Sequence, residues 1–206
     1  IGKLRSGILS ETEEKETVSA ISELIEYYKG IFRILSSCAS RQLEEVTFRR
    51  ATIPVTDIMA YAGKYFKRIS RGVDYKITLT IEPLEAKVIG DINQLRFLIE
   101  NLIDEALSFH QDGELVLKAI MDGEYVRFLF TDRRRKKQVE ELNQLFYPNL
   151  ARMTSGEKGE LRGTEYLICK QIIRDHDEFA GRRGCRINAE PAQGGGFTVY
   201  FTVPKR

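Results

Sequence analysis

Hydrophobic residues in the first part of the chain recur at steps of three and four positions. One helical face carries Val18, Ile21, Ile25, Tyr28, Phe32, Leu35, Ala39 and Val46. Gln42 is the one position of this series that is occupied by a polar residue. This heptad spacing predicts a single helix of about 35 residues. A helix of this length cannot bury its own stripe, so it packs either in an intramolecular bundle or against a second copy of the chain. The regularity of the seam favours the second arrangement, a dimerisation helix.

The rest of the sequence shows shorter and changing periods. Helices are expected over 56–70, 92–108, 139–145 and 165–175, the first capped by Thr56-Asp57 and the second by Asp91. Strands are expected over 75–81, 87–89, 114–121, 125–131, 185–189 and 197–203, with a strong hairpin signal at Asp122-Gly123. This irregular alternation predicts an α/β fold, a two-layer sandwich with a mixed, mostly antiparallel sheet. We therefore expect two domains, a helical module over 1–50 and an α/β domain over 51–206.

Composition and charge exclude several classes of protein. Hydrophobic residues make up 42% and charged residues 30% of the 206 positions, which is typical of a folded globular chain. The net charge of +2 provides no global field for nucleic acid or an anionic membrane. No apolar run approaches the ~20 residues that span a bilayer, and the first residues, IGKLR, show neither the apolar stretch nor the cleavage site of a signal peptide. Three scattered cysteines suit a reducing compartment. We expect a cytoplasmic piece of a longer protein, without membrane or nucleic-acid contacts.

Three segments carry motifs in a fixed order. They are GDINQLRFLIENLIDEALSF at 90–109, the strand 125–131 followed by Asp132, and the segment from Gly163 through its helix to GGGFTV at 194–199. Together they resemble the asparagine box, the first glycine box and the second glycine box of bacterial sensor histidine kinases. These kinases belong to the ATPase superfamily that includes DNA gyrase and heat-shock chaperones. The resemblance covers about 52–204, and three such motifs in order are far more specific than one.

The resemblance implies that ATP and Mg²⁺ are the cofactors. The residues at the family's cofactor-binding positions are Asp132, Asn101, Gly163, Thr164, Arg133 and Arg135, and those at its metal positions are Glu105 and Asn101. It also implies a phosphoacceptor histidine upstream of Ile1, because we interpret His110 and His176 as surface or helix-end residues. The implied partners are a second copy of the chain, bound through the N-terminal helix, and a response regulator or other downstream protein.

The chain departs from the family pattern in each box. Five cations, 133–137, replace the glycines that follow Asp132, and they form either a solvated loop or a phosphate contact. Glu105 stands where the family has its second asparagine. A carboxylate binds Mg²⁺ but repels phosphate when no metal is present. Leu161 and Glu165 replace two glycines of the second glycine box, and Glu165 would compete with phosphate for the helix N-terminus.

Two functions remain open. The first is the kinase core of an atypical two-component sensor histidine kinase, in which Asp132 reads adenine, Asn101 and Glu105 organise Mg²⁺, and 133–162 form the lid. The second is a pseudokinase with a degenerate, inactive pocket, which acts as a dimerising signalling module. Nucleic-acid binding is the weakest interpretation, because neither basic cluster, 133–137 or Arg182-Arg183 with Arg186, is interleaved with stacking aromatic residues.

Overall fold

The computed structural model describes residues 48–72, 74–107, 112–134, 136–147 and 164–206, together with 17, 18 and 21. The chain divides into two compact units, Ile1–Val46 with Leu150–Thr164 and Thr47–Asn149 with Glu165–Arg206. In the first unit, Thr17, Val18 and Ile21 are helical. The rest of the predicted dimerisation helix lies outside the described residues, so the helix and its seam stay predictions. The sheet and the helices that pack on it form the second unit.

A five-stranded mixed sheet is the centre of this unit. The elements in chain order are β1 (Ala51–Pro54), α3 (Val55–Ile69), β2 (Asp74–Glu82), β3 (Lys87–Gly90), α4 (Ile92–Leu107), β4 (Asp112–Asp122), β5 (Tyr125–Asp132), α5 (Val139–Gln144), α7 (Thr164–Phe179), β6 (Ile187–Pro191) and β7 (Phe197–Pro204). The strand order is β2-β4-β5-β7-β6, and β1 pairs separately with β3. The β2–β4 pair is parallel, whereas the other pairs of the sheet are antiparallel.

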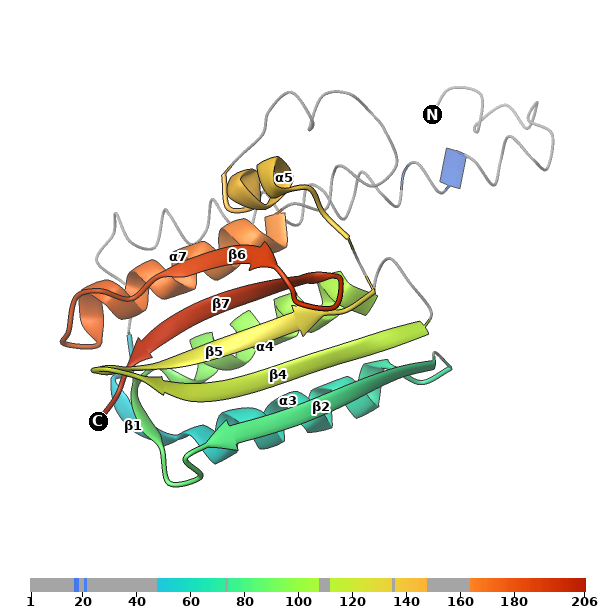
Figure 1. The fold of residues 1–206 in the computed structure, drawn as a ribbon. Coiled ribbons are helices and arrows are strands. Elements are labelled where there is room, and N and C mark those ends of the chain that lie inside the picture. Colours follow the sequence, from blue (N-terminus) through green and yellow to red (C-terminus); the bar gives the residue numbers. More distant parts are fainter. Residues whose placement is uncertain are drawn as a thin grey trace. The chain divides into compact units, whose positions relative to one another are not determined.

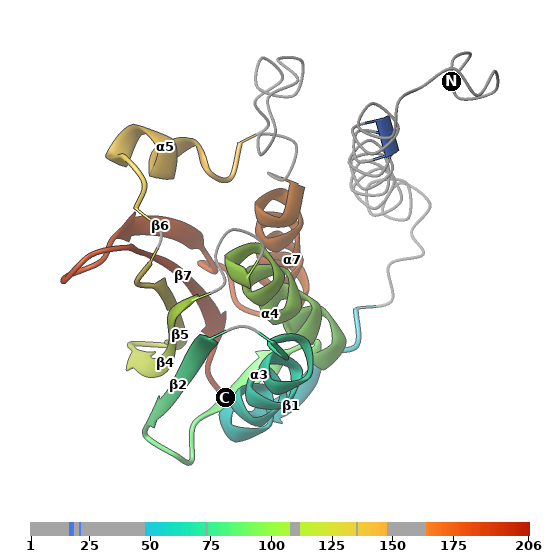
Figure 2. The ribbon, with the colours of Figure 1, turned by 90° about the vertical axis from the view of Figure 1, so that its right-hand side faces the viewer.

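The helices α3, α4 and α7 lie on one face of the sheet, as Figure 1 shows from the open face and Figure 2 from the side. Strand alternation explains this arrangement, because Val126, Phe128 and Phe130 of β5 are buried while their neighbours are only half-buried. Phe128 stacks on Phe201 of β7, with ring centroids 4.9 Å apart. Burying such a side chain contributes about 1.5–3 kcal/mol. The predicted two-layer α/β sandwich with a mostly antiparallel sheet is confirmed.

The helices α3 and α4 begin with different caps. Asp91 caps α4 as predicted, because its Oδ1 accepts the N–H groups of Asn93 at 2.9 Å and Gln94 at 3.3 Å. The predicted cap at Thr56-Asp57 is wrong, since α3 begins at Val55 after Pro54, which makes no side-chain capping bond. The first N–H of the helix, that of Val55, instead donates to the Ala86 backbone oxygen at 2.9 Å. Among the described residues, no helix combines the length and apolar character needed to span a bilayer.

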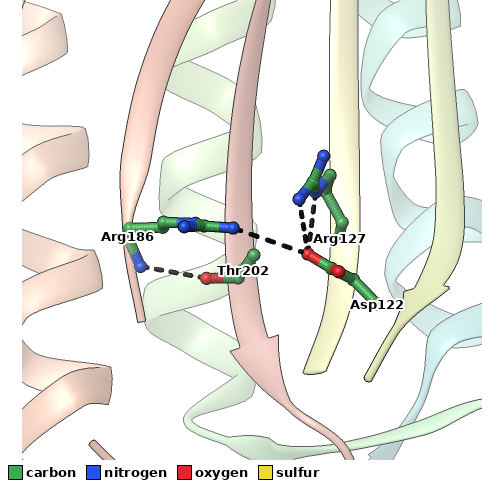
Figure 3. Close-up of polar contacts among 4 residues, drawn as sticks. All are labelled: Asp122, Arg127, Arg186 and Thr202. Atoms are coloured by element: carbon green, nitrogen blue, oxygen red, sulfur yellow. Dashed lines mark hydrogen bonds and ion pairs between the residues drawn. The ribbon is translucent and has the colours of Figure 1, made fainter. Parts of the chain in front are cut away.

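The β4–β5 hairpin turns one residue later than predicted. Asp122 pairs with Tyr125, so Gly123 and Glu124 form the loop, and Gly123 takes a positive φ of 60°. Asp122 is held in β4 by Arg127, whose Nη2 lies 2.6 Å and whose Nε lies 3.0 Å from Oδ2 of the carboxylate (Figure 3). The strand predicted from Cys185 likewise starts later, at Ile187, because the Cys185 N–H donates to Asp177 instead of joining the sheet.

A polar cluster on the face of the sheet opposite the helices joins three strands. In Figure 3 the Arg186 guanidinium reaches toward Asp122, with 3.8 Å between Nη2 and Oδ2. The Arg186 N–H donates to Oγ1 of Thr202 on β7 at 3.0 Å. These contacts tie the entry of β6 to the β4–β5 hairpin. They lie at the end of β5 away from Asp132, so they position the sheet rather than the candidate site.

Candidate functional site

Asp132 lies at the last position of β5 and is 2% exposed. The alternation that buries Phe130 places it on the same face of the strand. Its Oδ1 accepts the N–H of Arg134 at 3.0 Å and the hydroxyl of Tyr75 at 3.5 Å. Burial of a carboxylate is costly unless hydrogen bonds compensate it, so a buried acid at a strand end is a candidate for a binding role.

Asn101 and Glu105 are also buried, at 5% and 3% exposure. They lie one helical turn apart on α4, and Leu98 lies three residues before Asn101 on the same helical face. The backbone oxygen of Leu98 is 3.8 Å from Sγ of Cys169, which places α7 beside this part of α4. Both polar residues are thus withdrawn from solvent, unlike the solvent-facing positions common on amphipathic helices. That they face Asp132 across one cavity stays a prediction.

The side-chain amide of Asn101 is oriented by its own helix. Its Nδ2 donates to the backbone oxygen of Phe97 at 2.6 Å, which uses the amide as donor and leaves Oδ1 as the acceptor end. Mg²⁺ in nucleotide sites takes one or two protein oxygens together with phosphate oxygens. Asn101 Oδ1 and the Glu105 carboxylate fit this demand. In the described part of the chain, no cluster of three or more His, Cys, Asp and Glu residues offers a closed metal site.

The basic segment after Asp132 is partly engaged with β4. Arg133 Nε lies 3.3 Å from Glu114, and Arg134 Nη2 lies 3.5 Å from Asp112, all four side chains being roughly half-exposed. Such surface ion pairs contribute only about 0–1 kcal/mol and exchange readily. Both arginines therefore remain available to an anionic ligand at small cost.

Three of the predicted cofactor positions are described only in part or not at all. Arg135 and Gly163 lie outside the described residues, and for Thr164 the structure gives the backbone alone, as the first residue of α7. The part played by these three residues stays a prediction.

The beginning of the predicted lid packs on α7. The α5 helix starts with a capping box between Gln138 and Glu141. After α5, the Phe146 ring meets Tyr166 edge-on at 5.7 Å, and Lys170 Nζ donates to the Phe146 backbone oxygen at 3.2 Å. A cavity of about 400 Å³ lies between this segment, α7 and β6.

Two features near Asp132 were missed at the sequence level. Gly196 takes a φ of +80°, and a Cβ there would overlap the Asp132 carbonyl oxygen, so glycine lets the turn before β7 pass over the end of β5. The sequence showed the three-glycine turn but not what it crosses. Tyr75 on β2 was predicted only as an inward-facing strand residue. No local signal could have indicated its contact with Asp132, which is 57 residues away.

His176 lies in the last turn of α7, as expected of a helix-end residue. It is not a surface residue, however, because its side chain is fully buried. Nε2 accepts the Asp91 N–H at 3.1 Å, so Nδ1 carries the proton and donates to the Ile172 backbone oxygen at 2.8 Å. Burial lowers the pKa of His176. His110 lies outside the described residues.

Asp91 connects the entering chain to two helices. Its Oδ2 accepts the Arg49 N–H at 2.8 Å, while Oδ1 caps α4 and its own N–H binds His176 on α7. The Phe48 ring packs edge-on against the His176 ring at 5.0 Å. Residues 48–50 are therefore anchored at the end of the sandwich where α4 begins.

Comparison with known proteins identifies the family. Residues 90–206, more than half of the chain, match the family model of the histidine kinase-, DNA gyrase B- and HSP90-like ATPases. The chain belongs to this ATPase family. The predicted resemblance is thereby confirmed, and Asp132, Asn101 and Glu105 lie within the region matched to the ATPase model.

Solved histidine kinases share the fold of this ATPase domain. The histidine kinase AdeS of Acinetobacter baumannii matches 98% of this chain with 90% of its own, at a TM-score of 0.65 and 14% identity. The ATP-binding domain of PrrB from Mycobacterium tuberculosis matches 77% of this chain with 98% of its own, at 0.57 and 17%. Full-length ShkA in complex with AMPPNP matches 94% of this chain with 39% of its own, at 0.68 and 16%. No curated protein sequence matches the chain.

Proposed function

We propose that this ATPase domain is the cytoplasmic kinase core of a two-component sensor histidine kinase, which binds ATP and Mg²⁺ and phosphorylates a histidine on a preceding segment. The observation that carries the proposal is the buried Asp132 carboxylate at the end of β5. A buried carboxylate accepts a hydrogen bond from the amino group of adenine and disfavours the carbonyl oxygen that guanine has there. The AMPPNP complex of ShkA, a structural neighbour, supports the same choice of ligand.

The residues of α4 bind the metal, and those of the basic segment bind the phosphates. Asn101 Oδ1 and Glu105 hold Mg²⁺, and bound Mg-ATP supplies the phosphoryl group and its charge neutralisation. Arg133 and Arg134 exchange Glu114 and Asp112 for phosphate oxygens, with which arginine also forms charge-assisted hydrogen bonds. Arg135, Gly163 and Thr164 complete the phosphate side of the site. His176 is excluded as the phosphoacceptor, because its ring is fully buried and both nitrogens are hydrogen-bonded.

The partners of this core follow from the same proposal. We expect a homodimer formed by the heptad seam of the N-terminal helix, and a response regulator that receives the phosphoryl group. In this arrangement the two ATPase domains are held near the phosphoacceptor helices by the dimer.

A pseudokinase is the second candidate, and one observation favours it. Glu105 brings a buried carboxylate, and with it a negative charge, to the predicted metal position, where phosphate would enter. Without metal, such a charge strongly disfavours a triphosphate in a partly buried site. In this alternative the pocket stays empty, and the domain acts through dimerisation alone.

Titration of labelled ATP with the whole chain separates the two candidates. A live pocket should bind ATP in millimolar Mg²⁺ and nearly lose binding in chelator. Asp132→Asn should abolish binding, whereas Asp122→Asn, at the other end of the sheet, should leave it unchanged. Glu105→Gln should lessen the need for metal, with Asp104→Asn on the exposed face of α4 as its control. If neither the wild type nor Glu105→Gln binds at millimolar Mg-ATP, the kinase proposal is wrong.

A further inference from the structure

The structure brings the hydroxyl of Tyr75 to the Asp132 carboxylate. The side chain starts on β2, two strands away from β5, and is only 6% exposed. Its hydroxyl lies 3.5 Å from Oδ1 of the carboxylate. The ring must therefore cross β4, the strand that lies between β2 and β5.

Gly113 makes this crossing possible. It is the residue of β4 that pairs directly with Tyr75. A Cβ at Gly113 would lie 2.6 Å from Cζ and 2.8 Å from the hydroxyl oxygen of Tyr75. Such distances are far below van der Waals contact, so any side chain at this position would displace the ring. The glycine and the tyrosine thus form a matched pair that delivers a hydroxyl to the end of β5.

The Tyr75 hydroxyl keeps its proton and acts as a donor. Burial, and next the negative charge of Asp132, raise the pKa of Tyr75 to about 12. The backbone N–H of Arg134 donates to the same oxygen, Oδ1, at 3.0 Å. Two donors that converge on one oxygen restrict the rotation of the carboxylate about its last bond.

We propose that Tyr75 is a positioning residue that fixes the Asp132 carboxylate and thereby sets the preference of the pocket for adenine over guanine. This inference rests on the proposed function, because it assumes that a purine is read by Asp132. A fixed carboxylate meets the amino group of adenine without a loss of rotational freedom and holds its charge against the carbonyl oxygen of guanine. Without the Tyr75 hydroxyl, the carboxylate can rotate. This rotation weakens the hydrogen bond from the adenine amino group and relieves the repulsion of the guanine carbonyl oxygen.

Tyr75→Phe removes the hydroxyl and keeps the ring over Gly113. We expect this variant to bind Mg-ATP about five- to tenfold more weakly, since ordering a mobile side chain on binding has a cost of this order. Mg-GTP binding should not weaken, because the repulsion of its carbonyl oxygen is relieved. The dissociation constant for Mg-GTP divided by that for Mg-ATP should fall accordingly. Tyr125→Phe is the matched control, because its hydroxyl also donates a hydrogen bond distant in sequence, to the Arg183 backbone oxygen, at the opposite end of β5. It should change neither constant.

The outcomes distinguish this inference from the proposed function. Selective loss of ATP affinity in Tyr75→Phe, in a variant that remains folded at the assay temperature, supports it. Equal loss for both nucleotides shows a packing role only and overturns it. Unchanged constants in Tyr75→Phe overturn it while the proposed function stands. If the wild type binds neither nucleotide at millimolar concentration, the proposed function fails, and the inference fails with it.

Discussion

Replacement of His176 should lower the stability of the ATPase domain by an amount that its contacts allow us to work out. The ring is fully buried, accepts the Asp91 N–H and donates to the Ile172 backbone oxygen. In His176→Ala the buried Asp91 N–H loses its acceptor, which costs about 1–3 kcal/mol, whereas the Ile172 backbone oxygen loses only the second of its two donors, because it keeps the helical bond from the N–H of residue 176. The missing ring adds a cavity penalty. We expect the free energy of unfolding to fall by about 4 kcal/mol.

Two further variants separate the two hydrogen bonds. His176→Gln carries an oxygen at about the reach of Nε2 and can retain the bond from Asp91, whereas His176→Asn carries an amide at about the reach of Nδ1 and can retain the bond to Ile172. Each of these variants should lower the free energy of unfolding by about half as much as His176→Ala does. Urea titration followed by circular dichroism measures all three. A loss below about 1 kcal/mol for His176→Ala would refute the reasoning, because burial without partners costs more than that.

The same residue should make stability depend on pH. Burial lowers the pKa of His176 from its ordinary value of 6.5, although the bond to Ile172 and the charge of Asp91 act to raise it. Below pH 6.5 the unfolded chain therefore binds a proton that the folded chain does not, so the free energy of unfolding falls as the pH drops. Above that value the stabilisation is complete. His176→Gln lacks this titration, and a wild type with the same pH dependence as His176→Gln between pH 5 and 7 would contradict the assignment.

Three other expectations concern different parts of the chain. Gly196→Ala should lower the free energy of unfolding by more than about 2 kcal/mol, because backbone strain and overlap with Asp132 add there. Gly72→Ala has a similar positive φ but lies in open space, so it should lose only the strain energy of about 1 kcal/mol. Guanidinium titration compares the two variants, and equal losses would contradict the overlap. Phe146→Ala should speed hydrogen exchange of the α5 amides, because the edge-on contact with α7 is lost; unchanged exchange would mean that the contact does not hold α5. Ile25→Asp combined with Phe32→Asp should give monomers in light scattering, and a wild type that is already monomeric at high concentration would refute the dimerisation helix.

The elements of the ATPase domain could be predicted because their signals are local. The alternation of apolar and polar residues predicts β5. Asp91 directly precedes the helical pattern of α4, so its side chain can reach the first N–H groups of that helix. The error at α3 has a different cause, since the first N–H of that helix donates to Ala86 and not to a side-chain cap. The hairpin moved by one residue because Asp122 is held in the strand by Arg127. Short-range rules therefore located the elements but did not fix their ends.

The candidate site was predictable only where the family motif names its residues. Asp132, Asn101 and Glu105 were found through the motifs, and the structure buries all three. The environment of His176 depends on Asp91, 85 residues away, and that of Tyr75 depends on the order of strands in the sheet. Such contacts arise from topology, so no pattern along the chain encodes them.

The position of β7 has a consequence for how the domain can be made. This last strand, Phe197–Pro204, lies between β5 and β6, so β6 joins the sheet only through it. During synthesis the earlier strands emerge from the ribosome with the edge of β5 open until β7 arrives. An open edge of this kind can pair with a strand of another chain. The sandwich therefore closes only after its final residues are released, and nascent chains that stall before Phe197 should be substrates for chaperones.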